Sequence, residues 1–159
     1  RVVGTDADLV DVDLEPLLED TLADFRAEYP EATIRAEVPS GVSVRGSAYL
    51  SAAIENAIEN AIVHDPGPEP TVEIEVRADD DTVTLTVSDD GPGIPDQEMQ
   101  AIETGEETEL IHASGIGLWL IDWIVRNSGG TVSWSNTDSG AAVRMELQRA
   151  TESDEPAKY

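Results

Sequence analysis

The sequence predicts a two-layer α/β sandwich in which three helices cover one face of a mixed, mostly antiparallel sheet. Segments with helical periodicity and segments with strand alternation follow one another in the order helix, strand, helix, hairpin, loop, helix and hairpin. Most strands are neighbours in the sequence and are joined by short turns, so we expect them to pair as hairpins. The amphipathic helices must then bury their apolar sides against one face of the sheet.

The first predicted helix begins at Leu14 and ends before Pro30, with Asp13 as its expected side-chain N-cap. Apolar residues recur at helical spacing along it and give one face for burial. These residues are Leu14, Leu17, Leu18, Leu22, Phe25 and Tyr29. Alternating apolar and polar residues then predict a strand over 34–38, and residues 42–44 can add a short strand after a turn.

The second predicted helix runs from about residue 47 to residue 64. Its apolar stripe is expected to contain Leu50, Ile54, Ala57, Ile58 and Ala61. The remaining predicted elements are a hairpin of strands 72–76 and 83–87 around the acidic turn 79–81, a Gly-rich segment 89–114, a helix from about 115 to 127, and a hairpin of strands 131–135 and 141–148.

One domain is expected, because a chain of 159 residues is close to the usual domain size. We place this domain at residues 13–149. Residues 1–12 are expected to be a linker or the end of a preceding helical segment, and residues 150–159 to be a polar tail.

Acidic residues dominate the composition. Asp and Glu number 34 against nine Lys and Arg, which gives a net charge of −25. Such a surface repels itself in dilute salt, whereas at molar salt the Debye length is only ~3 Å, so we expect a salt-adapted source. An acidic surface also argues against nucleic-acid binding, which needs a basic footprint. The lack of cysteine fits a cytoplasmic location, although a longer protein could be attached to a membrane through other domains.

The first motif lies on the second helix, where Asn56, Asn60 and His64 recur at intervals of four residues. This spacing places them on one helix face. Asn is a poor residue for a helix interior, so the line of amides indicates either a polar cleft or a solvated face. An amide oxygen is a hard ligand that suits Mg²⁺.

The second and third motifs are rich in glycine. Asp89, Gly91, Gly93 and Ile94 directly follow a predicted strand, and the glycines permit close approach of a ligand that a side chain would block. The run Ser114-Gly115-Ile116-Gly117-Leu118 opens the third helix, whose free N–H groups favour phosphate. That helix is expected to bury some combination of Leu118, Ile121, Trp123, Ile124 and Val125.

In this order and spacing, the three motifs resemble those of the GHKL ATPase superfamily and, within it, the catalytic domain of sensor histidine kinases. The resemblance covers about residues 12–148 and implies the Bergerat ATP-binding sandwich. It implies that Asn60 is a Mg²⁺ ligand, that Asp89 reads adenine and that segment 96–114 is a mobile lid. The residues expected to contact ATP are Asn56, Asn60, Asp89, Gly91, Gly93, Ile94, Ser114, Gly115, Ile116, Gly117 and Leu118.

The activity implied is transfer of the γ-phosphoryl group of ATP to a histidine on a separate dimerisation domain, with Asn56, His64 and His112 as the expected catalytic residues. The chain itself offers no acceptor histidine, so the partners implied are that upstream domain and a response regulator. His112 is the only potential cation of the segment 96–114, which has neither Lys nor Arg and lacks the phenylalanine of the family's usual box. It is either a phosphate contact or an exposed residue.

Other functions stay open from the sequence alone. A serine kinase of the same superfamily fits the motifs, and so does a degenerate domain that binds nucleotide or a partner without catalysis. A gyrase-like hydrolase is disfavoured, because such enzymes place a glutamate general base one turn before the Mg²⁺-binding asparagine. That position is Asn56, whose amide cannot abstract a proton.

Overall fold

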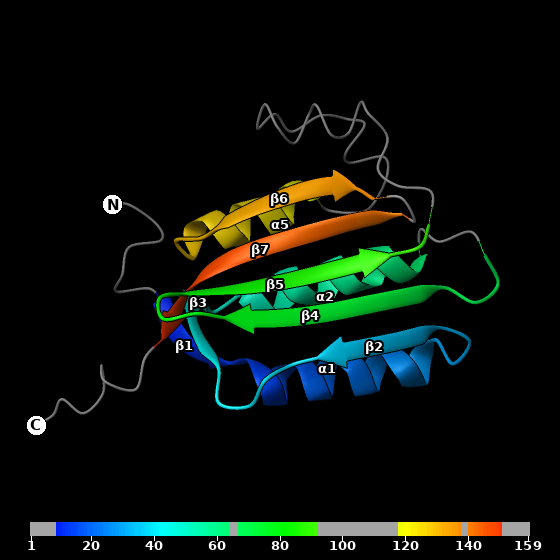
Figure 1. The fold of residues 1–159 in the computed structure, drawn as a ribbon, viewed down its shortest axis with the longest axis horizontal. Coiled ribbons are helices and arrows are strands. Elements are labelled where there is room, and N and C mark those ends of the chain that lie inside the picture. Colours follow the sequence, from blue (N-terminus) through cyan, green and yellow to red (C-terminus); the bar gives the residue numbers. More distant parts are fainter. Residues whose placement is uncertain (1–8, 64–66, 92–117, 138–139, 151–159) are drawn as a thin grey trace, which may run out of the picture.

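The computed structural model describes residues 9–63, 67–91, 118–137 and 140–150 (Figure 1). Its elements are β1 (Leu9–Asp13), α1 (Leu14–Glu28), β2 (Thr33–Glu37), β3 (Ser43–Ser47), α2 (Leu50–Val63), β4 (Thr71–Ala78), β5 (Thr82–Asp89), α5 (Leu118–Asn127), β6 (Thr131–Asn136) and β7 (Ala141–Ala150). This is the predicted order with one additional strand, β1.

The seven strands form one sheet in the order β1-β3-β7-β5-β4-β2, and β6 also pairs with β7. One edge of β7 pairs with β5, and the other edge is shared by β6 along residues 141–146 and by β3 along residues 148–150. Only the ladder between β2 and β4 is parallel among the described strands. The predicted mixed and mostly antiparallel sheet is confirmed.

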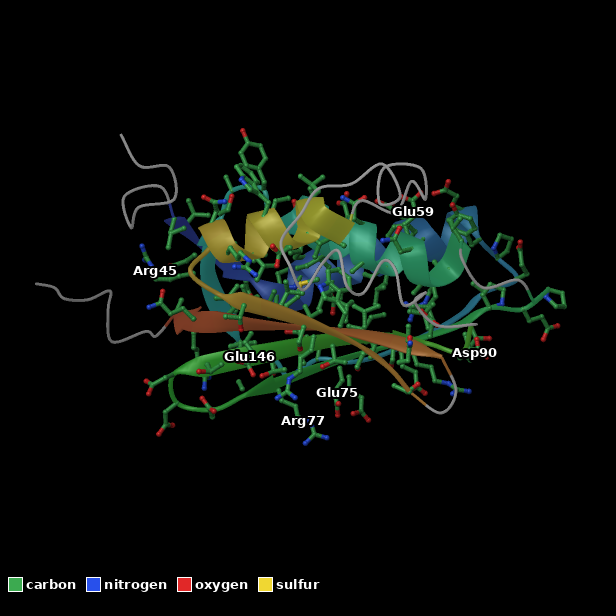
Figure 2. The ribbon with its side chains drawn as sticks, turned by 90° about the horizontal axis from the view of Figure 1, so that it is seen from above. Arg45, Glu59, Glu75, Arg77, Asp90 and Glu146 are labelled. Atoms are coloured by element: carbon green, nitrogen blue, oxygen red, sulfur yellow. The ribbon has the colours of Figure 1, made fainter. Side chains whose placement is uncertain are left out.

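The described helices α1, α2 and α5 all lie on one side of the sheet, and charged side chains such as Glu75, Arg77 and Glu146 project from the other side (Figure 2). The core lies between these layers. Strand β5 shows how alternation builds it: Val83, Leu85 and Val87 are buried, while the residues between them are half-buried on the opposite face. No helix in the described part of the chain is both long and apolar enough to cross a membrane.

Strand β1 was not predicted, because residues 9–12 were assigned to an irregular linker. It is an edge strand that pairs with β3 over residues 9–13, and Leu9 is its only buried residue. The alternation of buried and exposed residues in β1 is therefore too weak to predict a strand from the sequence. β7 ends at Ala150, slightly beyond the predicted end of the last strand.

Two predictions about individual side chains were wrong. Asp13 occupies the N-cap position of α1 but makes no side-chain cap hydrogen bond. The N–H of Leu14 instead donates to the carbonyl oxygen of Val42 at 3.0 Å, which satisfies that end of the helix from the β3 side. Trp123 was expected among the buried residues of α5, yet it is 48% exposed, because Ile121, Ile124 and Val125 form the buried face of this helix.

The end of α5 is fixed by a turn and a buried hydroxyl. Gly129 has a φ of +82°, which ends the helix in the left-handed region that favours glycine. The hydroxyl of Ser128 donates to Ile124 O at 2.9 Å and accepts the N–H of Ser47 at 2.8 Å. This contact joins α5 to the end of β3 across 81 residues of sequence and so holds the helix on the sheet.

Candidate functional site

The polar line of α2 lies at the border of its buried face. All five residues of the predicted apolar stripe are buried, together with Ala53 and Ile62, so the rotation of the helix against the sheet is fixed. Asn56 and Asn60 are half-buried beside this stripe, whereas Glu55 and Glu59 are exposed. Because residues four apart share a helix face, the two amides form one continuous polar edge.

Asp89 ends β5, and its carboxylate is held by two backbone groups. Its Oδ1 accepts the N–H of Gly91 at 2.9 Å and the N–H of Ala141 at 3.2 Å. The first bond shapes the start of the glycine-rich segment. The second bond ties the end of β5 to the start of β7, 52 residues away in the sequence. The carboxylate is therefore fixed in place by the fold.

Asp90 makes a second tie at the same end of the sheet. Its Oδ1 accepts the N–H of Thr71, the first residue of β4, at 3.3 Å. Two consecutive carboxylates thus join the end of β5 to the strands on both of its sides. The sequence analysis assigned a role to Asp89 but not to Asp90, and the only signal for the latter is a second acidic residue at the strand end.

Gly140 packs directly on the backbone of Asp89. A Cβ at this position would lie 2.1 Å from the carbonyl oxygen of Asp89 and 2.8 Å from its Oδ1. These distances are far shorter than van der Waals contact, so only glycine fits here without displacing Asp89. Gly140 lies between the two strands of the predicted hairpin, 131–135 and 141–148, and nothing local in the sequence marks its contact with a strand 51 residues earlier in the chain.

The predicted site residues that the structure describes lie at one end of the sandwich. α2 ends at Val63, and the next described element, β4, begins at Thr71, which contacts Asp90. Figure 2 shows Glu59 of α2 and Asp90 toward this end, with Arg45 of β3 at the other. α2 packs against β5, β4 and α5, so the amide edge and Asp89 belong to neighbouring elements.

Several predicted residues lie outside the described part of the chain. They are His64, Gly93, Ile94, His112, Ser114, Gly115, Ile116 and Gly117, together with the expected lid at 96–114. Leu118 is the first residue of α5, but its side chain is not described. Gly91 follows Asp89 and donates the hydrogen bond given above. The roles expected for these residues stay predictions.

The described arginines are all engaged by other groups. Five pair with carboxylates, namely Arg35 with Glu73, Arg45 with Asp11, Arg77 with Glu75, Arg126 with Asp122 and Arg144 with Glu146. Arg26 and Arg149 donate to the carbonyl oxygens of Ile34 and Asp79. The hydrogen bond to Glu75 is the main cause that raises the pKa of Arg77. Each described arginine thus already contacts a carboxylate or a carbonyl oxygen of the chain.

The comparisons with known proteins agree with this architecture. Residues 47–151 match the family described as histidine kinase-, DNA gyrase B-, and HSP90-like ATPase. The sensor histidine kinase ZraS of Salmonella typhimurium is 30% identical over 82 residues, which cover 51% of this chain and 18% of ZraS. The ATP-binding domain of PrrB from Mycobacterium tuberculosis is 26% identical, with a TM-score of 0.73, and the match covers 91% of this chain and 99% of that chain.

A third likeness concerns the fold alone. The histidine kinase ThkA, solved in complex with the response regulator protein TrrA, has a TM-score of 0.72 and 18% identity, and the match covers 89% of this chain and 42% of that chain. The present chain spans between 18% and 32% of the length of the curated relatives that it matches.

Proposed function

Since the chain belongs to the family of histidine kinase-, DNA gyrase B- and HSP90-like ATPases and is an ATP-binding catalytic domain of the sensor histidine kinase type, we propose that it donates the γ-phosphoryl group of ATP to a histidine on a separate dimerisation domain. One observation carries the proposal. The carboxylate of Asp89 is held by two backbone N–H groups at the end of β5, and β5 packs against α2, which carries the half-buried asparagines.

Asp89 would recognise the base of ATP. A carboxylate is only an acceptor of hydrogen bonds, and the exocyclic amine of adenine is a donor. Because the N–H groups of Gly91 and Ala141 both bond to Oδ1, the other oxygen is left to face a ligand. A rigid acceptor loses little conformational entropy on binding, which favours specific recognition.

Asn60 would hold Mg²⁺ together with the phosphates. Among the described residues, no group of three or more His, Cys, Asp or Glu is arranged to bind a metal ion. A site that offers one amide oxygen suits Mg²⁺, which commonly keeps water ligands and shares phosphate oxygens instead of filling a protein cage. When bound, Mg²⁺ would neutralise part of the phosphate charge, a task for which no described arginine is available.

The arrangement on α2 favours a kinase over a hydrolase of the gyrase type. Asn56 occupies the half-buried position one turn before Asn60, and an amide cannot act as a general base. Glu55 and Glu59 are exposed, and each directly precedes one of the two asparagines, so both are turned about 100° around the helix from it, to the same side. The described part of α2 therefore has no carboxylate in position to activate a water molecule beside Asn60.

The proposal also names partners and a location. A histidine-bearing dimerisation domain would receive the phosphoryl group from ATP, and a response regulator would take it from the phosphohistidine, in keeping with the complex of ThkA and TrrA. The first of these transfers uses ATP of the cytoplasm, where we therefore expect the domain to work.

Calorimetric titration of the chain with ATP in high KCl, with and without Mg²⁺, tests nucleotide binding. We expect saturable binding that strengthens when Mg²⁺ is present, since the metal screens the phosphates from the acidic surface. A chain that is folded by circular dichroism but shows no binding heat in either buffer would overturn the proposal.

Phosphoryl transfer needs a separate experiment. The chain incubated alone with γ-labelled ATP is expected to stay unlabelled. Addition of the histidine-bearing segment of the same protein should give an acid-labile label on that segment. Acid-stable label would indicate a serine kinase, and ATP binding without any label would indicate a degenerate domain; both contradict the proposed reaction.

A further inference from the structure

We propose that the start of β7 determines which oxygen of Asp89 faces the nucleotide base, and that Gly140 and Ala141 are therefore positioning residues for base selection. This inference rests on the proposed function, in which Asp89 contacts the base. It adds Gly140 and Ala141 as the residues that set the orientation of the Asp89 carboxylate. It also predicts that the preference for the base changes when the atom facing the base is a donor instead of an acceptor, as in Asp89→Asn.

The first support is the origin of the two hydrogen bonds on Oδ1. Gly91 follows Asp89 by two residues, whereas Ala141 comes from the next strand of the sheet. One local bond alone would let the carboxylate rotate about its χ2 torsion, which is broad and roughly two-fold. Two donors from different segments hold the same oxygen inward. No described residue donates to Oδ2, which is therefore the oxygen that is left for a ligand.

The second support is the close packing of Gly140. A Cβ added at Gly140 would lie 2.1 Å from the carbonyl oxygen of Asp89 and 2.8 Å from its Oδ1. The N–H of Gly140 donates to the hydroxyl of Thr137 at 3.0 Å, and the N–H of Thr137 donates to the carbonyl oxygen of Gly140 at 2.7 Å. These two bonds tie Gly140 to Thr137, and the N–H of the next residue, Ala141, donates to Asp89.

The chemical consequence is selection of an amino group over a carbonyl oxygen. An inward Oδ1 that already accepts two N–H groups leaves an outward acceptor, which attracts the 6-amino group of adenine and repels the 6-carbonyl of hypoxanthine. In Asp89→Asn, the same two N–H donors would hold the amide oxygen inward. The amide NH₂ would then face the base, where it can donate to a carbonyl but clashes electrostatically with an amino group.

The first experiment compares ATP with ITP, which carries a carbonyl at the 6-position, for the chain and for Asp89→Asn. The chain should bind ATP about tenfold or more tightly than ITP, and Asp89→Asn should reverse the order. An Asp89→Asn variant that still prefers ATP, or that binds both nucleotides equally, overturns the inference. A parent chain that binds neither nucleotide overturns the proposed function instead, so the two failures are distinct.

The second experiment uses two glycines that pack on strand backbones in the same way. A Cβ on Gly130 would lie 2.2 Å from the carbonyl oxygen of Glu146, which is ~16 Å along β7 from Ala141. Gly130→Ala is thus a matched steric control remote from Asp89. We expect both alanine variants to lower the melting temperature, but only Gly140→Ala to weaken ATP binding, by about tenfold.

The outcomes of this pair are decisive. ATP affinity that is unchanged in Gly140→Ala, or weakened equally in both variants, would show that Gly140 supports the fold and not the base contact. Should Gly140→Ala fail to fold, the nearly isosteric Asp89→Asn still decides the question through its ATP to ITP preference.

Discussion

Two aspartates at opposite ends of β5 make the same kind of hydrogen bond but have different structural roles. Asp79 precedes the strand, and its Oδ1 accepts the N–H groups of Asp81 at 3.0 Å and Thr82 at 2.8 Å. Asp89 ends the strand, and its Oδ1 accepts the N–H groups of Gly91 and Ala141 at 2.9 Å and 3.2 Å. Each carboxylate therefore satisfies two backbone donors with one oxygen.

The difference lies in where the donors come from. Both donors to Asp79 are within three residues of it, so the carboxylate only closes the turn between β4 and β5. One donor to Asp89 is 52 residues away, so that carboxylate joins two strand ends. Arg149 also donates to the backbone of Asp79, whereas no described arginine contacts Asp89. The locally held carboxylate completes a turn, whereas the one held from a distance joins two strand ends.

The largest expected effect is on ATP affinity, which should fall when Asp89 is replaced but not when Asp79 is replaced. Asp89→Ala should reduce ATP affinity about 100-fold or more, because the adenine amine loses its acceptor and the N–H groups of Gly91 and Ala141 lose their partner. Asp79→Ala should leave ATP affinity within about twofold, since the turn is remote from the site. Calorimetry on both variants at equal salt provides the comparison, and equal losses would contradict it.

A smaller effect is expected at the amide edge of α2. Asn60→Ala should weaken ATP binding about tenfold in the presence of Mg²⁺ and much less in its absence, because the amide oxygen proposed to hold the metal is removed. Asn127→Ala is a suitable control, since this half-buried amide of α5 donates to the carbonyl oxygen of Trp123 instead. The titrations are repeated with EDTA, and an Asn60→Ala defect that persists there would argue against metal binding by Asn60.

Salt should change affinity by a few-fold and in an unusual direction. Each described arginine already has a partner within the chain, and the whole chain has a net charge of −25. Raising KCl from about 50 mM to about 2 M screens this repulsion, so both ATP affinity and melting temperature should rise. A cationic phosphate site would lose affinity over the same range. Calorimetry and thermal melts across the KCl series test this, and flat or falling values would refute salt adaptation.

The smallest effect concerns the stability of the turn at Asp79. Hydrogen bonds from the N–H groups of Thr82 and Asp81, and then the charge of Arg149, hold the pKa of Asp79 below its ordinary value of 3.8. A lowered pKa in the folded state stabilises the fold above the ordinary value, and this contribution is lost as the pH falls through the lowered one. Asp79→Asn should therefore melt no more than about 3 °C below the parent at pH 7, and the difference should shrink as the pH falls below 3.8.

The contrast between the two aspartates also explains what could be predicted from the sequence. The acidic turn at 79–81 was predicted, because its donors and acceptor lie within four consecutive residues. The stripe and polar line of α2 were predicted from helical spacing, and all five stripe residues are buried. The tie from Asp89 to Ala141 and the packing of Gly140 were missed, because neither partner carries a local sign of the other.

The errors have the same physical origin. The cap predicted for Asp13 assumed a local bond, but the N–H of Leu14 is satisfied by Val42 on another segment. Trp123 was named among five residues of which some combination was expected to be buried, yet it lies on the exposed side of α5. In each case, the contact or the burial depends on how one element packs against another. The periodicity of a single segment carries no information about that packing.

The position of β7 has a consequence for how this domain is made. β7 is the last described strand of the chain, yet it lies in the middle of the sheet between β3 and β5. While the chain emerges from the ribosome, the pair β1-β3 and the set β5-β4-β2 have no ladder that joins them, and the facing edges of β3 and β5 stay unpaired. Non-local pairing of this kind is slow and leaves strand edges open to aggregation. The dense negative charge then serves a nascent chain as well as a folded one, because it keeps neighbouring unfinished copies apart until β7 closes the sheet.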